Sequence, residues 1–569
     1  MTTTPEDQLA TPQAEDVPGV TAPTQAVEPS RRSGGLRWGI ALAAVALIIG
    51  ATAATMFLLS GSSTPSTVSG YVPTGSYVYA EARLDLPGDQ RQGLANFLSH
   101  FPGFDDQAIF DQKIDEALDR LMGEGSKGEV TYTRDVKPWL GDSIALVGTG
   151  MPADIRSLQS KPPFLAIIAT KDPAAAKTWL AAQATGTATT ETYKGIEISV
   201  RNGDDAKMHA AWAVLDKVIV AGDLGSVRSA IDTGGTSSFA SSDRFRAAAA
   251  AIPGEQTAFF FVDAATVMAA IEDMPGMEAI PADQLARLPA WAAGGLRFES
   301  DAIVIQSAMP EVEGLPAASD KVSELAPFLP ADTIVALEGH TIGEYITTFI
   351  ANLKSSPEAK ASIEKLEEQA AMVGGLESFY SWIGDATVVV AGSGTDFDGG
   401  LVIKATDDAV LTGKVASIRN LLALAGSSTG ITLSDQPYGD GTITTIDLGD
   451  AGDSISEDIG KLAYNQQRGL LVIGLETFVK SVVDTKAGSS LADQPRYRAA
   501  VDRVGEANLG QAFVDVSALV AAASSVGVPQ AERATFDREY LPYLRPFSAL
   551  ATAGHAGDPL RSRTILIVQ

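Results

Sequence analysis

Cysteine is absent from all 569 residues of the chain. Its absence excludes disulfide bonds, thiolate metal sites and thiol nucleophiles, and it also excludes an acylated cysteine as a membrane anchor. The folded part must therefore be stabilised by ordinary burial of apolar side chains. A hydrophobic content of 45% is enough to build more than one core.

Positive charge is also scarce, because 42 Lys and Arg face 70 Asp and Glu and leave a net charge of −28. This balance excludes a non-specific nucleic-acid surface and argues against broad adhesion to anionic lipid headgroups. We interpret the acidity as a solvated surface, and we expect no nucleic-acid partner.

Residues that could hold a metal ion or a cofactor are few. The sequence has neither a Gly-Lys-Ser/Thr phosphate loop nor a dinucleotide fingerprint followed by an acid. The four histidines are scattered, without metal-ligand spacing, and are interpreted as exposed or satisfied single residues: His100, His209, His340 and His555. We therefore expect no cofactor and no metal site.

One long apolar run is present near the amino end. Residues 38–59 carry no charge, and a helix of that length, rising about 1.5 Å per residue, is long enough to cross a hydrocarbon core. Arg31, Arg32 and Arg37 precede the run, so the positive-inside bias places residues 1–37 in the cytoplasm and the bulk of the chain outside the cell membrane. The alternative is a cleaved signal peptide, but the long leader and the long apolar run favour a retained single-pass anchor.

Polar segments flank this run. Residues 1–37 contain repeated prolines and few large apolar groups, which predicts a disordered cytoplasmic tail whose threonines are conceivable phosphorylation sites. Residues 60–70 are rich in Gly, Ser and Thr, as expected for a linker.

The remainder of the chain contains an internal repeat. Ser237-Ser238 and Arg244-Phe245-Arg246-Ala247-Ala248 recur 252 positions later as Ser489-Ser490 and Arg496-Tyr497-Arg498-Ala499-Ala500. We predict a tandem duplication with repeat one at 71–310, a linker at 311–327 and repeat two at 328–569. Each repeat is long enough for its own core.

Within a repeat, short strand patterns and hairpin turns outnumber crossover helices. Asp172-Pro173 is typical of a helix start, and Ser300-Asp301 is typical of a hairpin turn between two apolar strands. The expected fold class is therefore α+β: one transmembrane helix followed by two homologous lobes with mainly antiparallel sheets backed by helices.

A Trp-Leu/Ile-Gly-Asp block occurs in both repeats, as Trp139, Gly141 and Asp142 and again as Trp382, Gly384 and Asp385. We interpret the tryptophans as packing residues, the glycines as turn residues and the aspartates as caps of the turn. Gly141-Asp142-Ser143-Ile144 resembles the nucleophile block of a lipase and esterase family. However, an Asp-x-x-His partner is absent and the second copy has Ala386, so no catalytic residue is assigned.

Two basic pairs recur in the repeats, Arg244 with Arg246 and Arg496 with Arg498. They could clamp anionic sugar or phosphate groups, but ion pairs with nearby acids such as Asp263 and Asp515 are the favoured interpretation.

These motifs carry a family resemblance. Pro73 with its following strand, the block at Trp139 and the strand–helix junction from Phe164 resemble the actinobacterial family with domain of unknown function 3352. The resemblance implies a membrane-tethered exported protein and assigns no activity.

The leading hypothesis is a non-catalytic envelope protein that binds or scaffolds an envelope protein or a glycan, with the cleft between the lobes as its binding place. One alternative is an extracytoplasmic hydrolase that uses carboxylates such as Asp142 and Asp385. The other is a sensor that signals to the tail. Small residues in the span permit helix pairing, so a homodimer stays open: Ala43, Ala44, Ala46 and Gly50.

Overall fold

The structure is a computed structural model. It describes residues 66–569 apart from short gaps at 87, 105, 107–108, 126–129, 151–162, 184–187, 203–208, 273–287, 313–315, 356, 372–373, 394–395, 449–460 and 527–529. The predicted tail, the predicted span at 38–59 and most of the first linker lie outside these residues. In the described ranges, no helix has the length and apolar character needed to cross a membrane.

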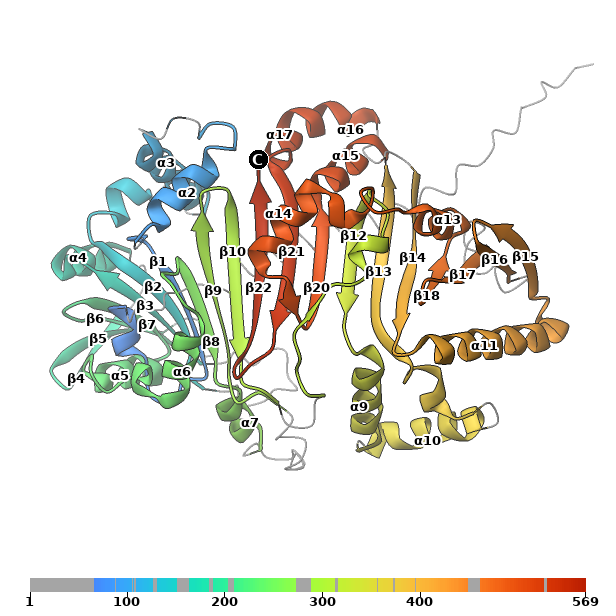
Figure 1. The fold of residues 1–569 in the computed structure, drawn as a ribbon. Helices are drawn as coiled ribbons and strands as arrows, with labels where there is room; N and C mark the ends of the chain where they lie inside the picture. The colour runs from blue at the N-terminus through green and yellow to red at the C-terminus, as the bar shows by residue number, and fades with distance from the viewer. Residues whose placement is uncertain are drawn as a thin grey trace, which may run out of the picture.

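A single antiparallel sheet of twenty strands forms the body of the molecule (Figure 1). Its first run has the spatial order β4 (Ala188–Tyr193), β5 (Ile196–Asn202), β6 (His209–Val214), β7 (Val218–Gly222), β3 (Phe164–Thr170), β2 (Leu140–Gly148), β1 (Val78–Arg83), β8 (Ala258–Val262), β9 (Ala292–Glu299) and β10 (Ala302–Met309).

The second run repeats that order in its own strands. From its outer edge inward it comprises β15 (Thr432–Tyr438), β16 (Gly441–Asp447), β17 (Lys461–Gln467), β18 (Leu470–Gly474), β14 (Asp396–Ala405), β13 (Ile383–Ser393), β12 (Thr333–Gly339), β20 (Gly510–Asp515), β21 (Phe547–His555) and β22 (Leu560–Val568). A separate two-stranded sheet pairs β11 (Lys321–Val322) with β19 (Ala507–Asn508).

The two runs meet at the pairing of β10 with β22, which we call the seam. The pairing extends from Ala302 opposite Ile567 to Met309 opposite Leu560. Charged side chains reinforce it, because Arg503 contacts Glu299 at 2.6 Å and Asp301 at 3.0 Å across the seam. The sheet is therefore continuous from one half of the molecule to the other.

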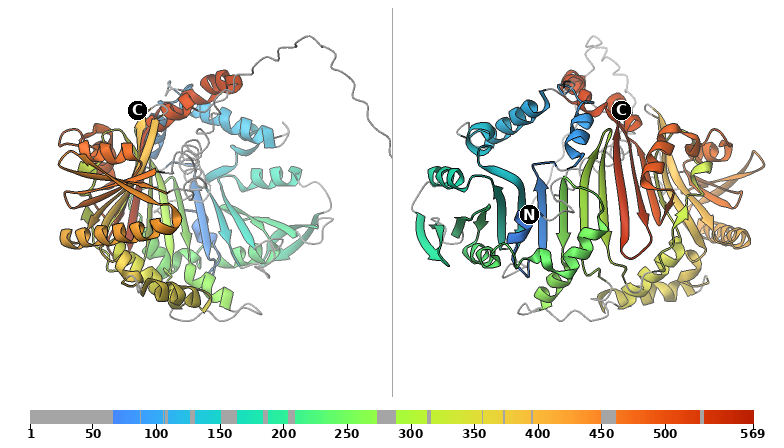
Figure 2. Two further views of the ribbon diagram at one scale, coloured as in Figure 1. Left: turned by 90° about the vertical axis from the view of Figure 1, so that its right-hand side faces the viewer. Right: turned by 60° about the vertical axis from the view of Figure 1, so that its left-hand side comes forward.

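Helices back the sheet and account for most of the remaining described chain. They are α2 (Gln90–Leu98), α3 (Phe110–Gly125), α4 (Pro173–Gln183), α5 (Leu224–Thr233), α6 (Asp243–Ala251), α7 (Ala264–Glu272), α9 (Ile342–Ser355), α10 (Pro357–Ala371), α11 (Asp408–Thr429), α13 (Glu476–Asp484), α14 (Pro495–Val504), α15 (Val516–Val526), α16 (Gln530–Thr535) and α17 (Leu541–Leu544). In Figure 1, α2 and α3 lie at the top of one half, whereas α9 and α10 lie at the bottom of the other. Figure 2 shows that the sheet twists strongly along its length.

Local signals explain several of these elements. The main-chain N–H of Ala175 donates to Asp172 Oδ1 at 2.9 Å, so the predicted start of α4 is correct. The predicted hairpin at Ser300-Asp301 joins β9 to β10. A mixed α+β fold with a large antiparallel sheet backed by helices is thus confirmed, whereas the division into two homologous lobes stays a prediction.

Parts of the predicted linkers are ordered elements of the body. A 3-10 helix, η1 (Val68–Tyr71), covers the end of the predicted linker 60–70 and the first residue of predicted repeat one. Within 311–327 lie β11 and most of a second 3-10 helix, η5 (Ala326–Phe328). Val68 and Leu325 are completely buried in the core, so both segments pack against the body there, and the predicted domain bounds stay a prediction.

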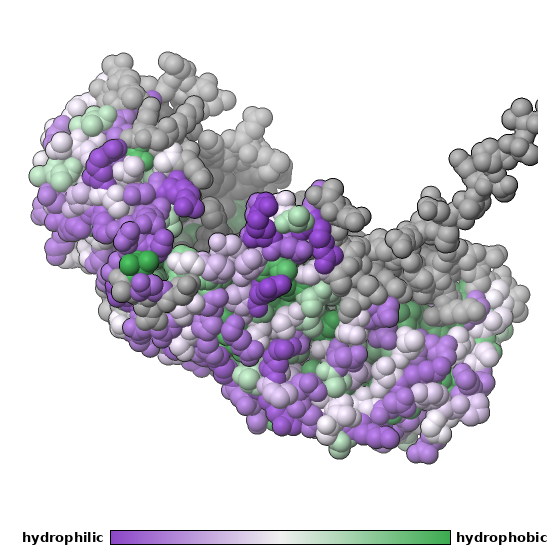
Figure 3. Space-filling model, turned by 90° about the horizontal axis from the view of Figure 1, so that it is seen from above, coloured by the Kyte–Doolittle hydropathy of each residue, from purple (hydrophilic) through white to green (hydrophobic). Residues whose placement is uncertain are grey.

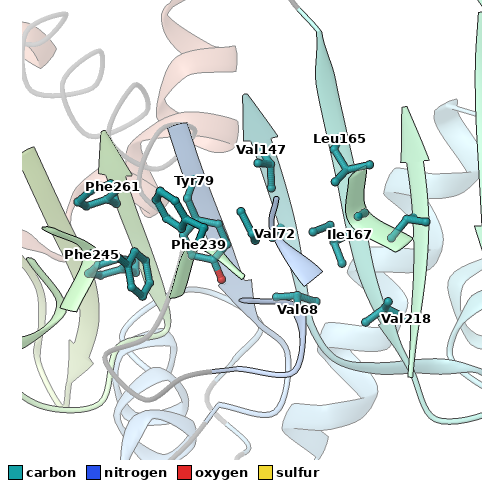
Figure 4. Close-up of a cluster of buried hydrophobic side chains, with 14 of the residues drawn as sticks. Val68, Val72, Tyr79, Val147, Leu165, Ile167, Val218, Phe239, Phe245 and Phe261 are labelled. Atoms are coloured by element: carbon teal, nitrogen blue, oxygen red, sulfur yellow. The ribbon is translucent and has the colours of Figure 1, made fainter. Parts of the chain in front are cut away.

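Aromatic rings fill the centre of the first half. Tyr79, Phe239, Phe245 and Phe261 gather on one face of the sheet (Figure 4), with ring centroids 5.0 to 6.2 Å apart. Tilted and edge-on ring pairs of this kind are favourable beyond the area they bury.

The hydrophobic cores are not separated at the seam. Ala302 and Val304 of β10 belong to the core of the second half. Another cluster joins Phe97 and Ile303 of the first half to Leu566 of the second. Each half thus has a large cluster of its own, and a further cluster draws on both halves, because strands that pair across the seam bury side chains against both.

Replacing Ile303 with alanine should lower the free energy of unfolding by about 2–4 kcal/mol, because it empties a buried site at the seam. Urea denaturation followed by far-UV circular dichroism would measure this loss. Leu337→Ala is a matched control, since its side chain is 48% exposed and its truncation should change stability little. Equal losses in the two variants would contradict a shared core at the seam.

Candidate functional site

The Trp-Leu-Gly-Asp block of the first half begins a strand. Trp139 is buried beside Trp179, with ring centroids 5.3 Å apart, and its indole Nε1 donates to the Asp135 carbonyl oxygen at 2.8 Å. Gly141 lies in β2 where the register with β3 shifts, and a Cβ there would sit 2.7 Å from the carbonyl carbon of Ala169. The turn expected at Gly141 is thus wrong, because glycine serves here for close strand approach.

The second block has the same architecture. Trp382 is buried and its Nε1 donates to the Phe379 carbonyl oxygen at 2.9 Å. Gly384 lies at a register shift in β13, where a Cβ would be 2.9 Å from the carbonyl oxygen of Lys404. Here too the predicted turn is replaced by an irregular strand start.

Ser143 is completely buried and donates a hydrogen bond to the Asp142 carboxylate at 2.7 Å. The other oxygen of Asp142 accepts from Thr67 at 3.3 Å. Among the described residues no histidine contacts Ser143, so nothing there would activate this hydroxyl as a nucleophile.

The first arginine of each basic pair binds a nearby aspartate. Arg244 donates to both oxygens of Asp263 at 3.0 Å, and Arg496 contacts Asp515. Asp263 and Asp515 also accept from the main chain at the start of α7 and α15.

The second arginine of each pair is bound near the start of its own helix. Arg246 pairs with Asp243, and Arg498 pairs with Asp493. All four guanidinium groups therefore have carboxylate partners within the chain.

Each half buries a glutamate that was not anticipated from the sequence. It lies in the strand that comes first along the chain, β1 in one half and β12 in the other. In β1, Glu81 is 1% exposed and its Oε2 accepts from the Tyr79 hydroxyl, while Oε1 has no hydrogen-bond partner. We call Glu81, Tyr79 and the nearby Asp142 the Glu81 cluster.

The matching position of β12 is Glu338, which accepts a hydrogen bond of 2.6 Å from Ser323. His340 lies two residues on, with its Nδ1 3.3 Å from Asp385 and 3.9 Å from Glu338. Its Nε2 is 3.1 Å from Asn508 Oδ1. We call Glu338, His340, Asp385 and Asn508 the Glu338 cluster.

Burial controls the proton affinity of both glutamates. It raises the pKa of Glu81 to about 7, although the hydrogen bond from Tyr79 acts in the opposite direction. Burial likewise raises the pKa of Glu338, against the hydrogen bond from Ser323.

The histidine and the aspartate behave as a charged pair. Burial opposes charge on both, but their mutual attraction across 3.3 Å outweighs it. The pKa of His340 is therefore raised, and the pKa of Asp385 is lowered, to which nearby Lys321 contributes.

A short sequence signal marks these clusters. The chain reads Glu81-Ala82-Arg83 in β1 and Glu338-Gly339-His340 at the end of β12, an acid followed two residues later by a base. An acid in an otherwise apolar strand could have been singled out. The partners could not, because Ser323 and Asn508 come from distant segments.

Both clusters can hold and exchange protons, but their access to a substrate is limited. His340 and Glu338 are almost fully buried. Within the described ranges, no group of three or more His or acidic residues is arranged to hold a metal ion.

A hollow of about 370 Å³ lies at the seam on the side of α2 and α17. Its walls come from both halves, with His100, Phe101 and Pro102 after α2 and Pro542, Arg545 and Pro546 around α17. Arg545 is exposed and has no ion-pair partner among the described residues. Figure 3, which views the molecule from this side, shows a mainly hydrophilic surface with small hydrophobic patches.

Comparison with known proteins places the chain in a family. The model of a family described as a protein of unknown function, DUF3352, matches residues 40–564, and the chain belongs to this family. No curated protein matches the chain.

Two crystal structures of TP0453, forms I and III, share 10% and 9% identity with it. They cover 44% and 46% of this chain and 81% and 85% of their own. Their TM-scores of 0.23 and 0.20 are too low to support any argument about the fold.

His340→Gln should destabilise the protein more at about pH 6 than at about pH 9. The raised pKa of His340 means that its stabilising charge is fully present below its unfolded value and is lost as pH rises through the folded value. A loss of about 1.5–3 kcal/mol is expected at the lower pH, as for a charge-assisted hydrogen bond. Urea denaturation at both pH values measures it.

His100→Gln serves as the control for this comparison, because the His100 ring contacts only main-chain carbonyl oxygens in α2. The same loss for His340→Gln at the two pH values would show that the imidazolium does not stabilise the Glu338 cluster.

Proposed function

We propose that this chain is a non-catalytic binding or scaffolding protein of the cell envelope. Residues 38–59 anchor it in the cell membrane as a single span, and the described part lies outside the cell. Its partner is an envelope protein or a glycan, with the membrane contacted only through the span. The apolar run behind three arginines supports the anchor and its orientation.

We also propose that the two runs of ten strands are homologous copies. The recurring blocks in the sequence and the repeated strand order support this origin. The matching carboxylates Glu81 and Glu338 support it further, because unrelated halves would have no reason to bury an acid at the same strand position.

The observation that carries the binding role is the hollow at the seam. Its volume of about 370 Å³ is within the range of small-ligand pockets, and its walls combine Phe101 and three prolines with the unpaired Arg545. In a chain of net charge −28, an arginine without an acidic partner favours an acidic group on the ligand.

Topology can be tested by adding protease to intact cells that produce the full chain. The proposed orientation predicts that residues beyond the span are digested while the cells stay sealed, because the protease cannot cross the membrane. Immunoblotting with antibodies against the carboxyl end would follow the loss. If that end survives until the cells are lysed, the envelope location is wrong.

The seam hollow can be tested by crosslinking, since a chain without cysteine accepts one unique label. Ser99→Cys carrying a benzophenone should capture an envelope component in native membranes. Adding Arg545→Glu should reduce capture at least about tenfold, because a charge-assisted hydrogen bond contributes about 1.5–3 kcal/mol and each 1.4 kcal/mol is a factor of about ten. Mass spectrometry of the adducts would quantify the change.

Thr432→Cys, on the exposed edge strand β15, supplies the control label. Capture of the same component from both positions, or capture unaffected by Arg545→Glu, would remove the seam hollow from consideration as the binding place.

A further inference from the structure

Among the described residues, the side chains that line the seam hollow include one arginine and no acid. The guanidinium of Arg545 has no ion-pair partner in this part of the chain, the last residue, Gln569, included. The arginines of the recurring basic pairs, by contrast, are all bound by carboxylates. In a chain of net charge −28, an unpaired base on the wall of a hollow attracts an acidic ligand.

The acidic group that suits Arg545 carries a single negative charge. A guanidinium group can donate two parallel N–H bonds to a carboxylate or to a phosphate. The chain as a whole is strongly acidic, so its repulsion acts more strongly on a phosphate, with nearly two charges, than on a carboxylate. The lining contains neither a lysine nor a second arginine to offset that repulsion. The hollow therefore favours a carboxylate.

His100 lines the same hollow from the first half of the molecule. Its Nδ1 is 3.1 Å from the carbonyl oxygen of Asn96 and 3.2 Å from that of Phe97. A carbonyl oxygen only accepts hydrogen bonds, so in the neutral ring Nδ1 carries the proton and Nε2 carries a lone pair. Nε2 has no partner among the described residues. This lone pair repels a carboxylate and accepts from a hydroxyl group, so the ligand must carry both groups.

The rest of the lining is mainly apolar and is held in place from both halves. Phe101 packs edge-on against Phe547, with ring centroids 5.4 Å apart. Three prolines complete the apolar walls, and the N–H of Gln569 donates to the carbonyl oxygen of Pro546 at 2.8 Å. Flat groups of this kind can pack against the C–H face of a sugar ring, and they lose little conformational entropy when they do so.

We propose that the seam hollow binds a carboxylated sugar, of the uronic acid class, that is displayed by an envelope glycan. The proposal names the ligand of the binding role proposed above and rests on that role. The sugar carboxylate pairs with Arg545, a ring hydroxyl donates to Nε2 of His100, and the C–H face of the ring lies against Phe101. The volume of about 370 Å³ is near the lower end of small-ligand pockets, so the recognised unit is short.

A sugar ring suits this arrangement better than an acidic peptide does. The ring holds its carboxylate and its hydroxyls at nearly fixed separations, so binding orders few rotatable bonds. An acidic peptide must order its side-chain rotamers and its main chain, and its carboxylate side chains bring no hydroxyl group for Nε2.

Ligand-detected NMR on the purified full chain in nanodiscs tests the proposal with matched probes. The methyl glycoside of galacturonic acid, the acid probe, supplies both the sugar and the carboxylate, and its methyl ester removes only the charge. Butyrate supplies a carboxylate without hydroxyls, and glucose 6-phosphate supplies a sugar with a phosphate. The acid probe should bind at least about tenfold more tightly than the ester, because the ester lacks the charge-assisted bond to Arg545. Butyrate and glucose 6-phosphate should both bind more weakly than the acid probe.

Variants of the two walls separate their contributions. Arg545→Gln should lower the affinity for the acid probe to that for the ester. Arg538→Gln makes the same change of charge outside the hollow, where Arg538 pairs with Glu539, and should alter neither affinity. His100→Phe keeps a ring but removes the acceptor, so it should weaken binding of the acid probe and the ester alike, by about two- to tenfold.

The comparison of probes on the unmodified chain is decisive even if a variant folds poorly. Equal affinity for the acid probe and the ester, binding of butyrate or glucose 6-phosphate as tight as that of the acid probe, or no binding of the acid probe would overturn the proposal. Capture of envelope protein alone through Ser99→Cys would overturn it too, while the binding role would stand. Absence of any capture at Ser99→Cys would instead remove the binding role itself.

Discussion

Pairing of β10 with β22 is the interaction on which the rest of the structure depends. Without it, each run of ten strands would end in an exposed hydrogen-bonding edge, and the apolar side chains of β10 would face water. Two strands in matching positions of their runs meet antiparallel, as in a two-fold dimer, but within one chain. The contacts beside the seam match in the same way. Arg503 near the end of α14 reaches the β9–β10 turn, and Arg561 near the start of β22 donates to the carbonyl oxygen of Ala251 at the end of α6.

Within each half, a buried acid lies on a central strand. β1 pairs with β2 and β8, β12 pairs with β13 and β20, and the side chains of Glu81 and Glu338 are cut off from water there. Glu81 and Glu338 are held there by hydroxyl donors, which satisfy part of a carboxylate but do not neutralise it. The second half adds His340 where the first has Arg83, so a permanently charged base is replaced by one that titrates.

Strands and helix starts were largely predictable from the sequence, because alternation, Asp172-Pro173 and Ser300-Asp301 act over a few residues. The antiparallel α+β class followed from the many hairpins. The seam was not predictable, because no residue of β10 indicates from the sequence that this strand pairs with β22. The role of Gly141 was also misjudged, because close approach to Ala169 depends on a strand 28 positions away in the sequence. His340 looked like an isolated histidine, because its partners Asp385 and Asn508 become neighbours only in the folded sheet.

The outer edges of the sheet indicate how copies of the chain could and could not associate. β4 and β15 end the sheet, and each carries an acid bound by an arginine of a covering helix: Glu191 by Arg228 of α5, and Asp435 by Arg419 of α11. Pro437 removes a donor from β15 as well. Charges and proline on edge strands discourage pairing with another sheet. Extension of the sheet into a second copy is therefore disfavoured at both ends, so a homodimer would have to form through other surfaces.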